Sequence, residues 1–474
     1  MIKKLLSRYS PRYVRELVYM MQASEYYARD YLRWYHRARN FGAIEYRKRL
    51  EVTPKATILL ISAWMIVLAA LAVIVFGVRS GSDIPLFVAI GLIVTFPFLL
   101  AYAMLVPLII LNIIQIPIEI VIVERAKRVL ENHKGIRIGI AGSYGKTSMR
   151  EILKTVLGES KRVAAPSCSY NTPLGISKFV NNLNGDEEIL IFELGEYYPG
   201  DVWKLCKLVE PQIGIITGIN EAHLERFGTL EKTAKTIFEL AEYLKDKPVY
   251  VNCDNELARK KASLKHIKYT RAGAGSCHVF NPKTGIDGTF FRLSRHGQKI
   301  DASSRLLGLH NLGPMAVAAE IAFGLGLTAE QISLGISKTK PFEHRLEAKD
   351  SDGVMTIDDS YNGNPDGVTA AITFLASLTG CRRWYVTPGL VEMGSKQKIV
   401  HKEIGKKLAQ AGIERVVLIK NSVTPYIEEG LKEAGYRGEV IWFDDGPTAY
   451  SALPHMTVGR DIVLLQNDWP DQYE

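Results

Sequence analysis

Two long stretches without charge lie near the start of the chain. Residues 56–78 contain no charged side chain and are rich in Ile, Leu, Val and Ala. About 20 apolar residues are enough for a helix to cross a bilayer. After a short polar connection at 79–85, a second uncharged stretch runs over 84–118. The pattern predicts two membrane spans, over about 56–78 and 86–106, followed by an interfacial or packed amphipathic helix that ends near Asn132.

The second stretch is longer than one span needs, and Pro97, Pro107 and Pro117 interrupt it. Because proline breaks or kinks a helix, a single longer kinked helix is an alternative interpretation. A helical hairpin buried in a soluble core is another. A secretory signal is disfavoured, because the charged region that precedes residue 56 is too long for one.

A different pattern begins at Gly135. Apolar runs of strand length cover 136–141, 188–194, 212–217 and 249–252, and stretches with helical apolar spacing lie between them. Strands that alternate with helices predict an α/β fold with a doubly wound, mostly parallel sheet. In such sheets, ligands bind at the carboxyl ends of the strands.

The charge of the chain supports the membrane prediction. The formal net charge is +9, and residues 1–55 alone hold 13 Lys or Arg against 5 Asp or Glu. Basic residues also follow the second stretch, at Arg125, Lys127 and Arg128. Positive flanks on both sides of a hairpin place both ends in the cytoplasm, so the chain is predicted to be a multi-pass protein of the cytoplasmic (inner) membrane. The location of the charge disfavours nucleic-acid binding.

Aromatic and basic residues alternate at helical spacing in the basic segment 1–55, as at Tyr27, Tyr31, Trp34 and Tyr35. This spacing predicts helices that lie on the membrane surface. The five cysteines of the chain form no C-x-x-C pair, which disfavours a zinc site or a disulfide framework and fits a reducing compartment.

A glycine-rich turn follows the first strand of the soluble part. It reads Gly142-Ser143-Tyr144-Gly145-Lys146-Thr147, with Ser148 next, and a stretch of helical spacing comes after it. A strand, a glycine-rich loop and a helix form the context in which such a loop binds phosphate through backbone N–H groups and the helix N-terminus. The loop predicts ATP binding, with Lys146 on the terminal phosphates and Thr147 on Mg²⁺.

Two further polar residues follow predicted strands. Glu193 ends one apolar run, and His223 lies shortly after another. A carboxylate and an imidazole at this edge of the sheet are reasonable ligands for Mg²⁺ beside a triphosphate. The alternatives are a helix-capping glutamate and a hydrogen-bonded loop histidine.

Several stretches, in this order, resemble the Mur ligases, and within that family the branch that adds D-alanyl-D-alanine. The stretches are Gly142-Ser-Tyr-Gly-Lys-Thr-Ser-Met-Arg-Glu151, Asn171-Thr-Pro-Leu-Gly175, Glu193-Leu-Gly195 with Gly200, Ala222-His-Leu-Glu-Arg-Phe-Gly228, Gly308-Leu-His-Asn311, Arg345-Leu-Glu347, Asp358-Asp-Ser-Tyr-Asn-Gly-Asn-Pro365, and Glu392-Met-Gly394 with His401. The resemblance covers residues from about 135 to 450.

The resemblance implies a domain layout and a set of site residues. Residues 133–345 would form the central ATP-binding domain, and 346–474 a Rossmann-like C-terminal domain, after the surface helices of 1–55 and the hairpin region of 56–132. Asn311, Arg345 and Asp359 would contact the nucleotide together with the loop residues Gly142, Ser143, Gly145, Lys146, Thr147 and Ser148. Thr147, Glu193 and His223 would hold Mg²⁺, and Lys146, His223 and Arg345 would serve catalysis.

The chain departs from the family pattern at several positions. A lysine that is carbamylated to hold a second Mg²⁺ is expected fourteen residues after His223, where this chain has Ile237. Lys235 lies at a poor angle to replace it, so either a carboxylate such as Glu239 or a water completes the metal shell, or the site holds one strong Mg²⁺. Pro314 stands in place of a second asparagine. Gln466-Asn467-Asp468 replaces a Lys-Gly-Ser motif, and the hairpin stands where the family has its UDP-binding domain.

The resemblance implies an ATP-dependent ligase that activates a carboxylate as an acyl phosphate for attack by an amine. The expected partners are ATP, a cell-wall precursor peptide, an amino acid or dipeptide amine and membrane lipid, and the tether favours a precursor on a lipid carrier. Two alternatives remain open: a ligase for another envelope peptide such as a γ-linked polyglutamate, and a nucleotide-binding membrane scaffold without catalysis.

Overall fold

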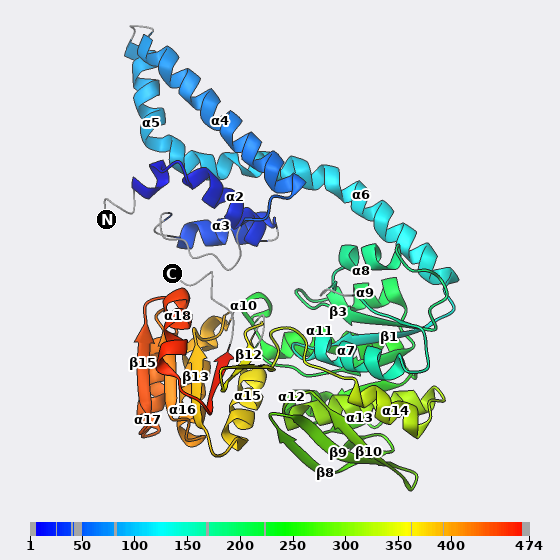
Figure 1. Ribbon diagram of the computed structural model, residues 1–474. Helices are drawn as coiled ribbons and strands as arrows, with labels where there is room; N and C mark the ends of the chain where they lie inside the picture. Colours follow the sequence, from blue (N-terminus) through cyan, green and yellow to red (C-terminus); the bar gives the residue numbers. More distant parts are fainter. Residues whose placement is uncertain are drawn as a thin grey trace. The chain divides into compact units, whose positions relative to one another are not determined.

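The computed structural model shows a chain of two compact units, one that extends to Val121 and one that begins at Ile122 (Figure 1). The structure describes residues 6–24, 26–38, 41, 50–79, 83–166, 170–221, 224–361, 363–391 and 393–466.

The first unit is helical, and its two longest apolar helices are those that the sequence predicts. Its elements are η1 (Ser7–Tyr9), α2 (Tyr13–Ala23), α3 (Ala28–Arg37), α4 (Pro54–Arg79), α5 (Asp83–Ala103) and the first part of α6 (Leu105–Asn132). Among the described residues, two helical segments are long and apolar enough to cross a membrane, Pro54–Arg79 and Leu86–Asn132. Only Met104 separates α5 from α6, Pro97 lies inside α5, and Pro117 lies inside α6.

Most of the aromatic residues of α2 and α3 are buried within this unit. Tyr31, Trp34 and Tyr35 are buried, whereas Tyr27 is exposed. The Tyr31 hydroxyl donates a hydrogen bond to the carbonyl oxygen of Ala101 at 3.0 Å, near the end of α5. The aromatic stripe in the sequence is therefore explained in large part by packing against α4 and α5.

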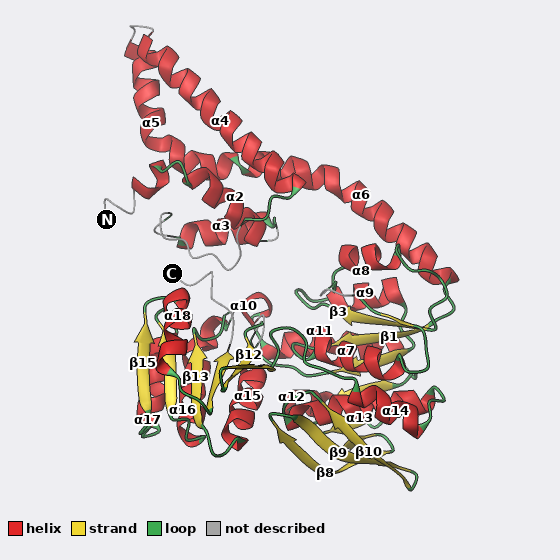
Figure 2. Ribbon diagram, in the orientation of Figure 1, coloured by secondary structure: helices red, strands yellow, loops and turns green. Residues whose placement is uncertain are grey.

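The second unit is α/β and contains two sheets, which confirms the predicted fold class (Figure 2). Within the described residues the larger sheet has ten strands in the order β10-β9-β8-β7-β6-β5-β4-β1-β3-β2. Its strands are β1 (Ile136–Ala141), β2 (Val163–Ala164), β3 (Ile189–Leu194), β4 (Ile213–Ile216), β5 (Val249–Asn252), β6 (Ile267–Thr270), β7 (Gly273–Ala274), β8 (Cys277–Gly285), β9 (Gly288–Arg295) and β10 (Gln298–Ser304). Strands β1 to β6 are parallel, and the antiparallel extension β7–β10 is an addition that the sequence did not predict.

Helices cover both faces of the parallel part of this sheet, because its strands are apolar on both sides. One face packs against α7 (Lys146–Leu157), α13 (Leu312–Gly324) and α14 (Ala329–Ser337). The other packs against α8 (Pro173–Val180), α9 (Asp201–Val209), α11 (Leu230–Leu244), α12 (Glu256–Lys261) and the last turns of α6. The short helices α10 (Leu224–Phe227) and η2 (Leu309–Asn311) complete this part.

The smaller sheet follows the larger one along the chain. In the described part of the chain it has six strands, in the order β11-β12-β16-β13-β14-β15, and all neighbours are parallel except β11 and β12. The strands are β11 (Glu347–Ser351), β12 (Val354–Asp359), β13 (Arg382–Thr387), β14 (Arg415–Ile419), β15 (Glu439–Phe443) and β16 (Asp461–Gln466). The helices are α15 (Pro365–Ser377), η3 (Gly394–Lys396), α16 (Gln397–Gln410), α17 (Thr424–Glu433) and α18 (Gly446–Met456).

Strand β1 lies between β3 and β4, so the order of the strands reverses at β1. Ligands of open α/β sheets bind beside such a reversal, outside the carboxyl ends of the strands. Ile140 of β1 is in register with Glu193 of β3, so the loop after β1 and the end of β3 lie next to each other. This topology places the glycine-rich loop and Glu193 in one site.

Candidate active site

The glycine-rich loop turns the chain from β1 into α7. Gly142 and Gly145 both have positive φ, of 148° and 76°. A Cβ at Gly142 would lie 2.2 Å from Oγ1 of Thr217, the residue after β4, so any larger residue at this position would clash with Thr217. The hydroxyl oxygen of Ser143 is buried and has no hydrogen-bond partner among the described residues. The loop thus holds its backbone at the N-terminus of α7 as a phosphate-binding loop requires.

Lys146 is paired with a glutamate that comes shortly after β3. Its Nζ donates to both carboxylate oxygens of Glu196, at 3.0 Å each, and to the carbonyl oxygen of Gly142. The side chain of Glu196 is 1% exposed and that of Lys146 is 12% exposed. The predicted phosphate-binding lysine is therefore held in place by a buried carboxylate.

Thr147 and Glu193, two of the three predicted Mg²⁺ ligands, are in contact. Thr147 Oγ1 donates to Glu193 Oε2 at 3.1 Å, and both residues are buried. Two neighbouring ligands of an octahedral Mg²⁺ at about 2.1 Å lie about 3.0 Å apart, so the spacing of this pair fits the ion. The other oxygen of Glu193 lies 2.7 Å from the guanidinium of Arg150, whose side chain is completely buried.

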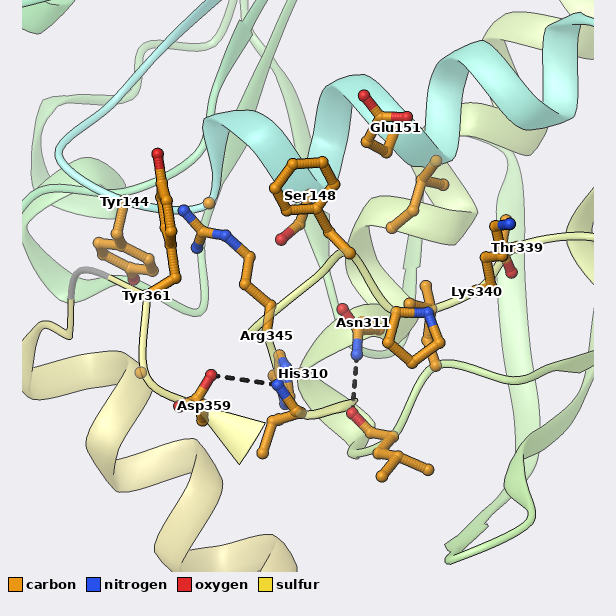
Figure 3. A pocket seen from close by; sticks show the side chains of 18 of the residues that line it. Tyr144, Ser148, Glu151, His310, Asn311, Thr339, Lys340, Arg345, Asp359 and Tyr361 are labelled. Atoms are coloured by element: carbon orange, nitrogen blue, oxygen red, sulfur yellow. Dashed lines mark hydrogen bonds between the residues drawn. The ribbon is translucent and has the colours of Figure 1, made fainter. Parts of the chain in front are cut away.

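A cavity of about 220 Å³ lies between the two sheets of the second unit (Figure 3). It brings together five of the predicted nucleotide contacts, which are separated by more than 200 residues in the sequence: Gly145, Ser148, Asn311, Arg345 and Asp359. Asn220, which follows β4, donates hydrogen bonds across the same gap to Asn364 at 2.9 Å and to Asp366 at 3.0 Å.

Arg345 is a buried cation in this cavity. Its guanidinium carbon lies 4.9 Å from the centre of the Tyr361 ring, and its Nε is buried without a hydrogen-bond partner among the described residues. Burial lowers the pKa of Arg345, and the nearby carboxylates of Asp359 and Glu193 partly oppose this. A buried N–H without a partner is costly, so Arg345 is suited to an anionic ligand.

Left-handed backbone fixes the position of Arg345. The residues on both sides of it, His344 and Leu346, have φ of 61° and 45°. Such values are uncommon outside glycine and unfavourable for leucine. The connection between the two sheets thus makes a sharp turn at this point.

Asp359 ends β12 and is held by two donors. Gln466 Nε2 donates to its carboxylate at 2.6 Å, and the backbone N–H of Leu346 donates at 3.2 Å. Burial raises the pKa of Asp359 to about 6. Gln466, which stands in the motif where the chain departs from the family pattern, therefore contacts a predicted nucleotide ligand.

Asn311 is buried, and its side-chain amide donates to the carbonyl oxygen of Leu307 at 2.8 Å. The neighbouring His310 also lines the cavity, and burial lowers its pKa to about 4. This histidine is therefore neutral at physiological pH and offers one donor and one acceptor to a ligand.

His223, the third predicted metal ligand, lies outside the described residues. No group of three or more His, Cys, Asp or Glu side chains suited to a metal ion occurs among the described residues. Ile237 is fully buried in the core, and Lys235 is exposed on α11. The carboxylate of Glu239 accepts hydrogen bonds from the backbone of Gly200 and Trp203, both at 2.9 Å, so it caps the start of α9 and is not free to complete a metal shell.

Two protein-family models match consecutive segments of the sequence that contain these site residues. The model described as "Mur ligase middle domain" matches residues 140–322, and the one described as "Mur ligase, glutamate ligase domain" matches residues 344–466. Together they cover more than half of the chain. The chain belongs to the Mur ligase family. The glycine-rich loop, Asn311, Arg345 and Asp359 all lie within the matched regions.

Curated relatives give a similar result. The chain is 28% identical over 294 residues to the UDP-N-acetylmuramoyl-tripeptide–D-alanyl-D-alanine ligase of Mycobacterium tuberculosis, which is 60% of this chain and 58% of that protein. It is 27% identical over 334 residues to the ligase of the same name from Bacillus subtilis, covering 69% and 72%. The chain thus matches less than two thirds of the mycobacterial Mur ligase's length.

Solved structures of a MurF ligase and of a pseudomurein peptide ligase share the fold. The MurF ligase from Thermotoga maritima in complex with ADP superposes with a TM-score of 0.65 at 22% identity, over 74% of this chain and 80% of that one. A pseudomurein peptide ligase type C from Methanothermus fervidus superposes with a TM-score of 0.54 at 18% identity, over 71% and 76%. At these identities the likeness concerns the fold alone.

Several residues of this Mur ligase site were not predicted from the sequence. Glu196 and Arg150 surround the phosphate loop, and Tyr361 and His310 line the cavity. Arg150, Tyr361 and His310 lie inside motifs that the sequence does identify, and Glu196 directly follows one, so the motifs located this region without indicating the partners of these residues.

Proposed function

We propose that this chain is an ATP-dependent ligase that joins an amine to a carboxylate of a peptidoglycan precursor peptide, with D-alanyl-D-alanine as the amine. The main support is Arg345, a buried cation whose Nε has no hydrogen-bond partner within the described part of the chain. It lies in the cavity that also contains Gly145 and Ser148 of the phosphate loop. The activity for which the curated relatives are named supports the choice of amine and acceptor.

The nucleotide would lie in the cavity, with its phosphates on the glycine-rich loop. Backbone N–H groups at the start of α7 and the Ser143 hydroxyl would donate to phosphate oxygens, as a helix N-terminus favours. Lys146 and Arg345 would offset the charge of the transferred phosphoryl group. Asn311 and Asp359 would bind the nucleoside.

The chemistry overcomes the low reactivity of a carboxylate toward amines. A carboxylate oxygen of the peptide attacks the γ-phosphorus, the bond to the β-phosphate oxygen breaks, and ADP leaves. The amine nitrogen then attacks the acyl carbon, loses a proton, and inorganic phosphate leaves. Protein groups contribute mainly by positioning the reactants and by excluding water, which would otherwise hydrolyse the acyl phosphate.

Thr147 and Glu193 would hold Mg²⁺, with His223 as a further ligand. The ion, when bound, neutralises phosphate charge during transfer. We infer one strong magnesium site, because Ile237 cannot be carbamylated and Glu239 caps α9. Strong stimulation of turnover by bicarbonate would contradict this, since bicarbonate is the source of a carbamate.

ADP release by the purified protein tests the ligase proposal. Candidate acceptors, both UDP-linked and lipid-linked, are mixed with D-alanyl-D-alanine or with glutamate, and the products are identified by mass. The proposal expects ADP release only when acceptor and amine are both present, with a mass gain of one dipeptide minus water. A gain of glutamate units would support a polyglutamate ligase, and no amine-dependent ADP release would indicate a scaffold.

We further propose that α4 and α5 anchor the enzyme in the cytoplasmic membrane, with the ligase part in the cytoplasm. The support is the length and apolar composition of these helices together with the basic flanks. Alkaline phosphatase fused after Arg79 should be active outside the cytoplasm, and the same fusion after Asn132 should be inactive. Equal activity of the two fusions, or release of the chain from membranes by alkaline carbonate, would contradict the anchor.

A further inference from the structure

A second cavity lies inside the helical unit, between its N-terminal helices and the two long apolar helices α4 and α5. Its volume is about 330 Å³, which is within the range of sites for small organic ligands. α4 contributes Trp64, Leu71 and Ile74 to the lining, α5 contributes Phe96 and Leu100, and the chain around η1 and the start of α2 forms a further wall. Trp64 and Leu71 are 46% and 49% exposed, so the protein leaves part of this apolar lining uncovered.

Arg8 is the one charged side chain in the lining, as far as the described residues go. Its guanidinium carbon lies over three aromatic rings, 4.4 Å from the centre of Phe98, 5.0 Å from that of Phe41 and 5.5 Å from that of Tyr35. The ring faces attract the cation, but the guanidinium also carries five N–H donors. Within the described ranges of the chain, none of these donors meets a carboxylate or another hydrogen-bond acceptor. A half-buried arginine in this state is suited to an anionic ligand.

Two tyrosine hydroxyls hold the wall that carries Arg8 against α5. Tyr9 donates a hydrogen bond to the carbonyl oxygen of Val94 at 3.0 Å, and Tyr13 donates to that of Pro97 at 2.7 Å. Arg8 directly precedes Tyr9 in η1. The guanidinium is therefore fixed beside the cavity by its rings and by its neighbour in the chain, so the site is formed before any ligand arrives.

The lining offers little with which to recognise a sugar or a peptide. The hydroxyls of Tyr9 and Tyr13 already donate to α5, and Ser10 Oγ accepts a hydrogen bond from the backbone N–H of Arg12 at 3.3 Å. Selection among ligands depends on a few polar groups at fixed positions, and here the main one is a single cation beside an apolar wall. This combination matches the phosphate and the acyl chain of a phospholipid.

We propose that the cavity binds an anionic membrane phospholipid, with its phosphate on Arg8 and one acyl chain between α4 and α5. Residues 1–55 hold 13 Lys or Arg against 5 Asp or Glu, so the segment attracts an anionic headgroup. Basic pockets between membrane helices on the cytoplasmic side are typical sites for such headgroups. A lipid there contacts α2 as well as α4 and α5, and so holds the N-terminal helices on the hairpin. The inference rests on the proposed membrane anchor and adds to it a bound lipid at a defined position.

The test uses the full-length protein in a neutral detergent and phospholipids with brominated acyl chains, because bromine quenches tryptophan fluorescence on contact. Anionic phosphatidylglycerol is compared with zwitterionic phosphatidylcholine. We expect saturable quenching of the wild type, with phosphatidylglycerol bound about tenfold more tightly, as one charge-assisted contact provides. Arg8→Gln should lower the affinity for phosphatidylglycerol to that for phosphatidylcholine. Equal affinities of the wild type for the two lipids, or an unchanged preference in Arg8→Gln, would overturn the inference.

Arg12→Gln is the matched control for the charge. It removes the same charge from an exposed position at the start of α2, outside the lining. The preference for phosphatidylglycerol should stay nearly unchanged in this variant. A loss equal to that in Arg8→Gln would indicate a general attraction to the basic segment and would overturn the site.

Two further variants test where the acyl chain lies. Trp64→Phe keeps a ring in the lining but should remove most of the quenching, and quenching that persists would place the chain elsewhere. Ala70, also in the lining, lies on α4, and Ala70→Phe narrows the cavity without changing Arg8. This variant should weaken the binding of both lipids, and unchanged binding would overturn the proposed position of the chain.

Other outcomes separate this site from the remaining proposals. If a polyprenyl phosphate displaces the brominated lipid at a far lower concentration than phosphatidylglycerol does, the occupant is a carrier lipid, and the choice of a bulk phospholipid is wrong. Release of the wild type from membranes by alkaline carbonate would contradict the anchor. A wild type that stays in the membrane and shows no preference for phosphatidylglycerol would contradict the lipid site alone.

Discussion

The guanidinium of Arg345 lies over the ring of Tyr361, 4.9 Å from its centre, in the cavity between the two sheets (Figure 3). Arg345 belongs to the connection between the sheets, and Tyr361 follows β12 of the smaller one. A planar guanidinium can lie over an aromatic ring and still direct its N–H groups outward in its own plane. The contact therefore orients the cation for a ligand that reaches it from the phosphate loop.

Replacing Arg345 with lysine keeps the charge but loses the stacking and the fork of donors. Hydrogen bonds to charged groups contribute about 1.5–3 kcal/mol, so Arg345→Lys should lower the affinity for ATP by about tenfold to a hundredfold. Titration calorimetry measures this. Arg382→Lys is a matched control, because Arg382 pairs with Asp461 at 2.6 Å at the far end of β13. The same loss in both variants would contradict a specific role for Arg345.

The pKa of Asp359 predicts a dependence of stability on pH. Burial raises this pKa to about 6, from an ordinary value of 3.8. The folded state therefore holds the proton to a higher pH than the unfolded state does, so the free energy of unfolding falls as pH rises from the lower value through the upper one. A shift of this size corresponds to about 3 kcal/mol. In Asp359→Asn an amide that does not titrate replaces the carboxyl group, so the variant should lack this dependence on pH.

The measurement is the thermal unfolding of wild type and Asp359→Asn between pH 4.5 and 7.5. All other titrating groups are common to the two proteins, so the difference between them isolates Asp359. The wild type should lose stability relative to the variant as pH rises. A difference that stays constant, or that changes in the opposite direction, would show that Gln466 and Arg345 offset the burial of the carboxylate.

Two glycines allow α16 and α17 to cross closely. A Cβ on Gly430 would lie 2.0 Å from the carbonyl oxygen of Lys402, and one on Gly405 would lie 2.1 Å from that of Ile427. Because both obstacles are backbone, Gly430→Ala has to separate the helices and should cost about 3 kcal/mol of stability. Chemical denaturation measures the stability of this variant against that of Gly459→Ala. A Cβ on Gly459 would have no neighbouring atom within 4 Å, so this control should have nearly the stability of the wild type. Equal stability of the two variants would contradict the close crossing.

The parts of the site that the sequence predicted are those that local chain structure determines. Gly142, Gly145 and Lys146 stand at the turn from a strand into a helix, and their spacing alone indicates a phosphate loop. The position of Glu193 follows from the rule that the ends of parallel strands share an edge. Neither requires knowledge of long-range contacts.

The unpredicted parts depend on which distant side chains meet. Lys146 and Glu196 are 50 residues apart, and Asp359 and Gln466 are 107 apart. Many carboxylates lie at such separations from a lysine, and only the register of β1 with β3 or of β12 with β16 selects the partner. The strands β8–β10 were missed because many of their side chains are polar and partly or fully exposed, so they lack a clear apolar pattern.

Thr147 offers a way to test the metal separately from the charges around it. Its hydroxyl is 3.1 Å from Glu193, and valine has nearly the same shape without the oxygen. Thr147→Val should therefore leave the pair between Arg150 and Glu193 intact while removing one proposed ligand of Mg²⁺. Loss of a ligand weakens the binding of Mg²⁺ and does not destabilise the fold. The Mg²⁺ concentration for half-maximal turnover should therefore rise about tenfold or more. Thr147→Ser keeps the hydroxyl and is expected to retain the wild-type response. If Thr147→Ser raises the Mg²⁺ requirement as much as Thr147→Val does, keeping the hydroxyl does not preserve the site, and this would contradict Thr147 as a ligand.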